Sequence, residues 1–152
     1  MYDSRRKSGA TVELGQRAYG PDSSREEREA ITARVSVVGE RILLLHELPV
    51  QTPFSVNLMF DRFDELARDW DRLAYVIDLT DAKRPDAATR FTLKQRVLRV
   101  SPRVTHVAAA VGANLLMRAM ARLVAHAMGL PSVGIHATRA QAIEEVRGAM
   151  ER

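Results

Sequence analysis

The sequence predicts an α/β fold with a mixed sheet, built in one domain over residues 31–150. Apolar stretches with the strand period of two alternate along the chain with helix-length stretches that keep a period near 3.6. Only the first two strand-like stretches follow each other directly, so we expect an opening antiparallel hairpin and parallel pairing after it. With 152 residues, 46% of them hydrophobic and 28% charged, the chain is long enough for one sizeable core. The expected order is β-β-α-β-α-β-α-β-α.

The chain is expected to begin with a polar, largely disordered extension over residues 1–29. This segment carries scattered glycine, proline and serine, and then a charged run with little apolar periodicity. The hairpin follows it. Residues 31–37 alternate between apolar and polar positions, residues 41–46 contain a dense apolar run, and Val38-Gly39-Glu40 between them predicts a tight turn.

The first helix of the domain has a clear start, because Thr52 is a good N-cap and Pro53 suits the first helical position. Its apolar positions continue to Trp70. Gly129 before a proline predicts the end of a later helix, and Thr138 predicts the N-cap of the last one. The remaining expected elements are a strand over 73–80, a helix over 85–100, a strand over 104–111, a helix over 114–128, a strand over 132–136 and a helix over 139–150.

Composition excludes several classes of protein. The absence of cysteine excludes disulfide scaffolds and thiolate chemistry, and no apolar run is long enough for a membrane span. We therefore expect a soluble, cytoplasmic protein. The net charge of +4 does not predict nucleic-acid binding, because the aromatic residues occupy core-like positions instead of interleaving with a basic stripe.

The helix expected over 85–100 has two apolar sides. Leu93 and Val97 lie on one side, whereas Phe91 and Leu98 lie on nearly the opposite one. A helix that covers a sheet needs only one such face, so the second is expected to bind a partner. The alternative is a kink or a shifted boundary that merges the two sides. The predicted partner-binding residues are Arg90, Phe91, Lys94 and Leu98.

Acidic side chains on the helix after Pro53 and basic ones on the helix over 85–100 also suggest pairing between two copies, so we expect a homodimer. The alternative is that both are ordinary solvated faces. Light scattering at low and high salt distinguishes the two.

An alternative function is a sensor of a small ligand, such as an anion, a nucleotide or a lipid, bound at the carboxyl ends of the strands. The residues expected to bind it are Thr80, Lys83, Arg84 and Asn114. His136 could meet Asp78, Thr80 and Asp81 at the same edge as a metal or acid–base site, but we favour the interpretation that they are ordinary polar edge residues. We predict no catalytic residue, metal site or cofactor.

Four short stretches form a recognisable set: the hairpin over 37–48, the strand ending Val76-Ile77-Asp78-Leu79-Thr80, Met128-Gly129-Leu130 at a helix end, and Thr138-Arg139-Ala140-Gln141-Ala142-Ile143 at a helix start. In their order and spacing they are similar to the STAS family, the SpoIIAA-like anti-anti-sigma factors. The resemblance covers residues 31–150 and implies a SpoIIAA-like fold. It also implies a non-enzymatic regulatory module whose partners are anti-sigma kinases or stressosome-like assemblies.

In the family, the phosphorylated residue is a serine at the start of a helix. It directly follows an aspartate, and that aspartate lies eight residues after the aspartate of the preceding strand, which is Asp78 here. Asp86 matches that aspartate, but Ala87 and Ala88 stand where the resemblance implies serines, and Thr89-Arg90 replaces Gly-Leu. The standard phosphoserine switch is therefore expected to be missing. Thr89 is either a phosphate acceptor near the positive end of the helix or a solvent-facing helix residue.

Overall fold

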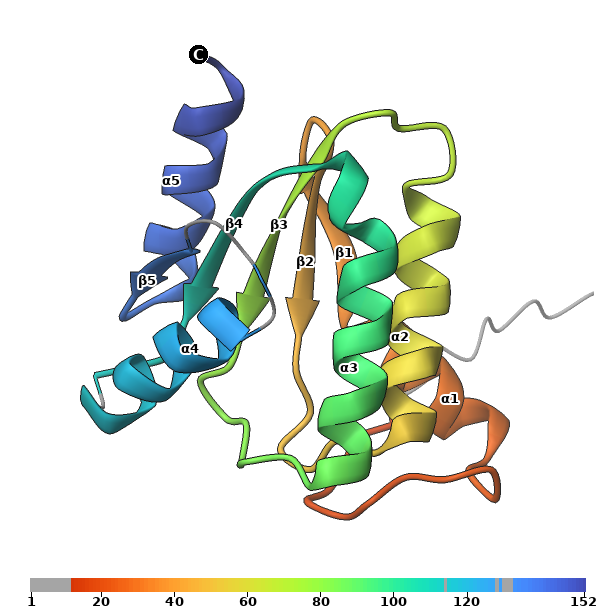
Figure 1. Ribbon diagram of the computed structural model, residues 1–152. Helices are drawn as coiled ribbons and strands as arrows, with labels where there is room; N and C mark the ends of the chain where they lie inside the picture. The colour runs from red at the N-terminus through yellow and green to blue at the C-terminus, as the bar shows by residue number, and fades with distance from the viewer. Residues whose placement is uncertain (1–11, 114, 128, 130–132) are drawn as a thin grey trace, which may run out of the picture.

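The computed structural model describes residues 12–113, 115–127, 129 and 133–152, and it confirms an α/β protein with a mixed sheet (Figure 1). Five strands lie in the order β1-β2-β3-β4-β5; β1 and β2 are antiparallel and all other neighbours are parallel. The elements are α1 (Arg25–Thr32), β1 (Val35–Gly39), β2 (Ile42–His46), α2 (Pro53–Leu66), β3 (Leu73–Asp78), α3 (Ala87–Val100), the 3₁₀ turn η1 (Ser101–Arg103), β4 (Val104–Ala110), α4 (Leu115–Ala127), β5 (Val133–His136) and α5 (Arg139–Met150).

The expectation of a disordered extension is wrong for its described part, residues 12–29. A capping box starts α1: the Ser24 hydroxyl accepts a hydrogen bond from the Glu27 amide at 3.1 Å, and the Glu27 carboxylate accepts one from the Ser24 amide at 2.9 Å. The helix then runs through Ile31, which is fully buried, so the first strand begins at Val35 and not at residue 31.

The hairpin turn is also shifted. Gly39 still belongs to β1, and the turn residues are Glu40 and Arg41. Arg41 has φ 58°, a left-handed conformation that is costly for a residue with a Cβ. The ladder contains an irregularity between Val37 and Gly39, and this local insertion moves the turn one residue further along the chain.

The other elements match the expected ones with small differences at their ends. Helix α2 stops at Leu66, short of Trp70, and β3 stops at Asp78 because Thr80 folds back onto that carboxylate. Thr52, Asp86 and Thr138 each cap the helix that follows with a side-chain oxygen. Gly129 has φ 70°, as expected of a residue that ends a helix.

Each face of the sheet contributes to its own core cluster. On one face α2 and α3 lie side by side in Figure 1, and α1 contacts α2. The large residues of this cluster include Leu43, Phe63 and Tyr75. On the other face α5 covers β3, β4 and β5. That cluster is rich in small side chains, which lets the helix approach the sheet closely: Ala74, Ala108, Ala110 and Ala142.

Over the part of the chain that the structure describes, no helix has the length and apolar character needed to cross a membrane.

Candidate functional site

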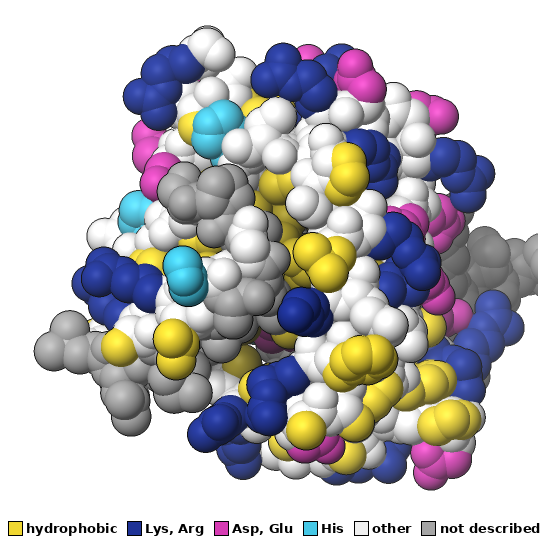
Figure 2. All heavy atoms as spheres, viewed as in Figure 1, with side chains coloured by type: hydrophobic (Ala, Val, Ile, Leu, Met, Phe, Trp, Pro, Cys, Tyr) yellow, Lys and Arg dark blue, Asp and Glu magenta, His cyan; other side chains and the backbone are white. Residues whose placement is uncertain are grey.

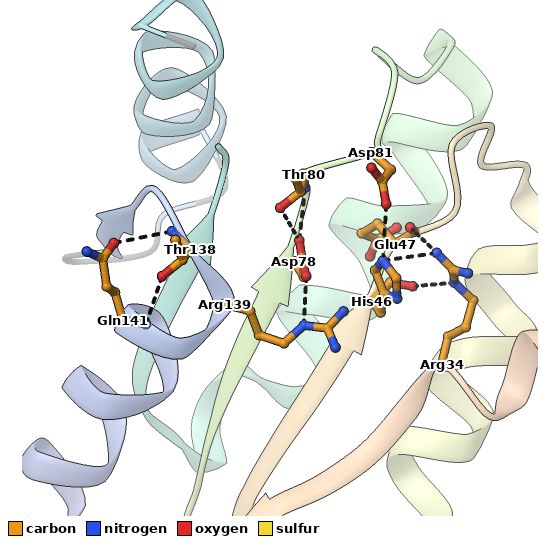
Figure 3. A network of polar contacts seen from close by, with 9 residues as sticks. All are labelled: Arg34, His46, Glu47, Asp78, Thr80, Asp81, Thr138, Arg139 and Gln141. Carbon is orange, nitrogen blue, oxygen red and sulfur yellow. Dashed lines mark hydrogen bonds and ion pairs between the residues drawn. The ribbon is translucent and has the colours of Figure 1, made fainter. Parts of the chain in front are cut away.

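Polar side chains gather where the parallel strands end. The register aligns His46 of β2 with Asp78 of β3, Asp78 with Ala110 of β4, and Ala110 with His136 of β5. These four positions therefore form one row across the sheet, on the face that α5 covers. Because α5 begins directly beyond β5, its first residues reach back to this row (Figure 3).

Asp78 is the centre of the row and is only 5% exposed. One carboxylate oxygen accepts hydrogen bonds from the Thr80 hydroxyl at 2.6 Å and from the Thr80 amide at 3.0 Å; the other accepts one from Nε of Arg139 at 2.8 Å. Burial alone raises the pKa of Asp78, but these donors outweigh it and bring the pKa below its ordinary value. Asp78 is thus a fixed anion that ties α5 to the sheet.

A second group lies beside it, at the end of β2. The Arg34 guanidinium donates to the main-chain carbonyls of His46 at 2.9 Å and Glu47 at 3.0 Å, and it lies 3.2 Å from the His46 ring (Figure 3). The other neighbour of that ring is Asp81, at 3.5 Å. Burial, followed by the charges of Arg34 and Arg139, lowers the pKa of His46 below its ordinary value, so the ring is neutral at physiological pH.

Glu47 is 6% exposed, and burial raises its pKa to about 7. Its carboxylate accepts a hydrogen bond from the Gln51 side chain. Gln51 in turn accepts one from the Ser55 hydroxyl in the first turn of α2, and its main-chain carbonyl accepts one from the Thr89 hydroxyl of α3 at 3.3 Å. Glu47 therefore belongs to a chain of hydrogen bonds that joins the starts of α2 and α3.

The residues predicted to bind a small ligand are not gathered around one point by the described contacts. The Thr80 hydroxyl is already engaged by Asp78, while Lys83 and Arg84 are exposed on the loop that leads to α3. Asn114 lies outside the described residues. The ligand alternative therefore stays a prediction.

The histidine hypothesis is corrected. His136 pairs with Glu145 of α5 at 2.6 Å, whereas Asp81 pairs with His46. The His136–Glu145 pair requires a glycine at position 134, because a Cβ there would collide with the Glu145 carboxylate. Within the described ranges no group of three metal-ligating side chains converges.

The structure at the start of α3 contradicts both interpretations of Thr89. Asp86 caps the helix by accepting a hydrogen bond from the Thr89 amide at 2.8 Å, as the resemblance to a switch aspartate would place it. Ala87 and Ala88 are exposed, but they carry no hydroxyl. Thr89 is fully buried, so it neither faces solvent nor offers its hydroxyl to a kinase.

The two-sided character of α3 is confirmed. Val97 and Val100 are each 2% exposed, whereas Phe91 is 64% and Leu98 50% exposed. Arg90 and Lys94 are exposed beside them. We call Arg90, Phe91, Lys94 and Leu98 the α3 face; Figure 2 shows apolar side chains alternating with basic ones along the front of the molecule, where Figure 1 has α3.

Arg96, another basic residue of α3, is buried at 8% exposure. Its guanidinium bridges to Asp61 and Asp64 of α2, both at 2.9 Å, and lies over the ring of Phe60. Part of the acidic face that we assigned to a second copy is therefore already paired within the chain.

Sequence reasoning missed Arg34 and Arg139, which donate hydrogen bonds to groups at the strand ends, and Glu47, which lies beside them. A charged residue between a strand and the apolar Leu48 was a usable signal for Glu47. Arg34 and Arg139 carried no local signal, because their partners lie 12 and 61 positions away along the chain.

The fold and these sites define the chain as an α/β protein with a hairpin-initiated mixed sheet, a row of polar side chains around the buried Asp78 at the strand ends, and an exposed helix face of apolar and basic residues. Comparison with models of protein families and with curated proteins returned no match.

Proposed function

We propose that the chain is a non-enzymatic, STAS-like interaction module that binds a regulatory protein through the α3 face. The observation that carries this proposal is the pair of large apolar side chains that α3 turns to solvent, Phe91 and Leu98. Burying each against a partner would contribute roughly 1.5–3 kcal/mol. Since α3 already covers the sheet with Val97 and Val100, its own fold has no need of the second apolar side.

The resemblance to STAS proteins supports the kind of partner. From β1 onward the elements follow the expected strand and helix order, with the matching aspartate at the N-cap of α3. Arg90 and Lys94 make the face basic, so the partner surface is expected to combine apolar and acidic groups. An anti-sigma kinase or a stressosome-like assembly is the partner class that the resemblance implies.

Regulation by the standard serine is not part of the proposal. Ala87 and Ala88 are accessible but chemically inert, and the hydroxyl of Thr89 is buried against the carbonyl of Gln51. Control of binding would have to act on the partner or elsewhere on this chain.

Site-specific crosslinking in cells tests the proposal. A photoreactive amino acid at Phe91 or Leu98 is expected to trap one defined protein, whereas the same residue at Leu123, which is 69% exposed on α4, is expected to trap none. With that protein purified, Phe91→Asp and Leu98→Asp should each weaken binding by at least about 30-fold, and Leu123→Asp should leave it unchanged.

The outcomes are distinct. A crosslink to another copy of this chain would identify the α3 face as a homodimer surface. Equal crosslinking from residues 91 and 123, or unchanged affinity of correctly folded Phe91→Asp and Leu98→Asp variants, would refute the proposal.

A further inference from the structure

A pocket of about 440 Å³ lies at the amino-terminal end of the sheet, opposite the polar row. The β1–β2 turn, the residue before β3, the start of β4 and the last turn of α5 surround it. Figure 2 shows basic side chains along the top of the molecule, where Figure 1 has the hairpin turn and the C-terminal end of α5. The cationic residues lining the pocket are Arg41, Arg72, His106, Arg147 and Arg152.

The charge around this pocket is positive. Four arginines line it, against the two carboxylates of Glu40 and Glu151. The carboxylate of Asp71, which pairs with Arg41, and about half a negative charge at the carbonyl end of α5 reduce this excess but leave it positive. The pocket also has an apolar part, to which Ile42, Ala149 and Met150 contribute. A ligand that fits this lining has an anionic group and an uncharged organic part.

Arg41, which lines the pocket, has an unusual backbone conformation. At φ 58° glycine or asparagine costs little, whereas arginine is strained. Its side chain is 47% exposed, and its ion partner Asp71 is 82% exposed and 3.4 Å away, so that pair is weak and can be exchanged for a ligand. The Arg41 side chain lines the pocket, where its guanidinium is available to an anionic ligand.

Arg147 is held more firmly. Its guanidinium donates to the Val38 carbonyl at 2.6 Å, which fixes the side chain on the hairpin and uses one of its five N–H donors. A fixed and an adaptable arginine on two sides of one pocket suit an oxyanion, because guanidinium groups bind phosphate oxygens in a bidentate manner.

From these observations we infer that the pocket is a binding site for a phosphate-bearing small molecule, with Arg41 and Arg147 as phosphate ligands. The site is separate from the α3 face and does not depend on the proposed function. It also lies at the opposite end of the sheet from the residues predicted to bind a ligand, Thr80, Lys83 and Arg84.

Titration of the full chain with pyrophosphate and with ADP, monitored by NMR of the backbone amides, tests the site. Both probes are expected to shift the signals of Arg41, His106 and Arg147, and to leave Thr80 and Arg84 unshifted. ADP is expected to bind more tightly than pyrophosphate because of the apolar part of the pocket. Shifts confined to residues 80–84, or no binding of either probe at millimolar concentration, would overturn the inference.

The substitution Arg41→Gly separates function from folding. It relieves the left-handed strain, so the urea midpoint of unfolding should equal or exceed that of the parent chain. At the same time the affinity for pyrophosphate should fall about tenfold or more, since a charge-assisted hydrogen bond is lost. Arg84→Ala removes the same charge from the opposite end and should leave the affinity nearly unchanged. Equal losses in the two variants would mean unspecific charge attraction and would contradict the site.

Discussion

At the scale of single residues, two charged side chains are buried in different ways. The guanidinium of Arg96 is compensated by two ion pairs, with Asp61 and Asp64. Glu47 has only neutral Gln51 as the direct partner of its carboxylate, so its protonated form is favoured up to a pKa of about 7. The proton on Glu47 is therefore coupled to the stability of the whole fold.

This coupling has a definite sign. In the unfolded chain Glu47 loses its proton near the ordinary pKa of 4.5, whereas the folded protein holds it to about 7. Between these values the folded state binds more protons, so the contribution of Glu47 to the free energy of unfolding falls as the pH rises. The total change is on the order of 3 kcal/mol, and it is complete above the folded pKa.

Replacing Glu47 by Gln mimics the protonated form and is expected to remove that loss. At about pH 5 the variant should be nearly as stable as the parent, and at about pH 8 it should be more stable by up to roughly 3 kcal/mol. Urea unfolding at both pH values measures the difference, with Glu144→Gln on the exposed side of α5 as control. A difference between Glu47→Gln and the parent that does not grow with pH would contradict a raised pKa.

At the scale of helices and strands, end signals decide where each helix starts and stops. Ser24, Thr52 and Thr138 form capping boxes with the residue three positions on, and Asp86 caps α3 with its carboxylate. These signals are local, and the caps at Thr52 and Thr138 were found at the residues expected from the sequence, whereas the helix capped by Asp86 was expected to begin at residue 85. The box at Ser24 was overlooked because its helix is short and mostly charged.

Replacement of glycine by alanine is expected to have opposite effects on stability at Gly148 and at Gly129. Gly148 lies within α5 with nothing near its missing Cβ, so Gly148→Ala should stabilise the fold by about 0.5–1 kcal/mol. Gly129 also has open space, but its φ of 70° strains any side chain, and Gly129→Ala should destabilise by about 1 kcal/mol. Thermal or urea unfolding of both variants measures this; the same sign for both would show that backbone conformation does not govern these positions.

At the scale of the whole molecule, the segment before the sheet belongs to the fold. Tyr19 is 2% exposed in the main core cluster. Its hydroxyl accepts a hydrogen bond from the Gly15 amide at 2.9 Å, and its carbonyl accepts one from the Thr52 hydroxyl at 2.6 Å. The segment thereby covers the start of α2, and the core extends beyond residues 31–150.

Tyr19→Ala is accordingly expected to cost about 3 kcal/mol of stability, because it leaves a cavity the size of an aromatic ring in the core. Tyr19→Phe keeps the ring and loses only the contact with Gly15, so it should cost about 1 kcal/mol or less. Chemical denaturation of the two variants measures both values. If Tyr19→Ala unfolds at the same urea concentration as the parent, the segment does not contribute to the core.

The sequence alone determined the class of fold, the hairpin and the two apolar sides of α3. These features depend on periodicity and end signals within about twenty neighbouring residues, and such patterns are visible along one chain. The same local reasoning found Thr52 and Thr138 as the N-caps of α2 and α5.

Only the tertiary structure decided which charged groups meet. Arg96 reaches α2, Arg139 reaches β3, and Arg147 meets Arg41 at one pocket, although each pair is separated by more than thirty residues. Burial of Thr89 and Glu47 has the same origin. Strand register and the approach of helices to the sheet set these contacts, and neither quantity is encoded in the spacing of neighbouring residues.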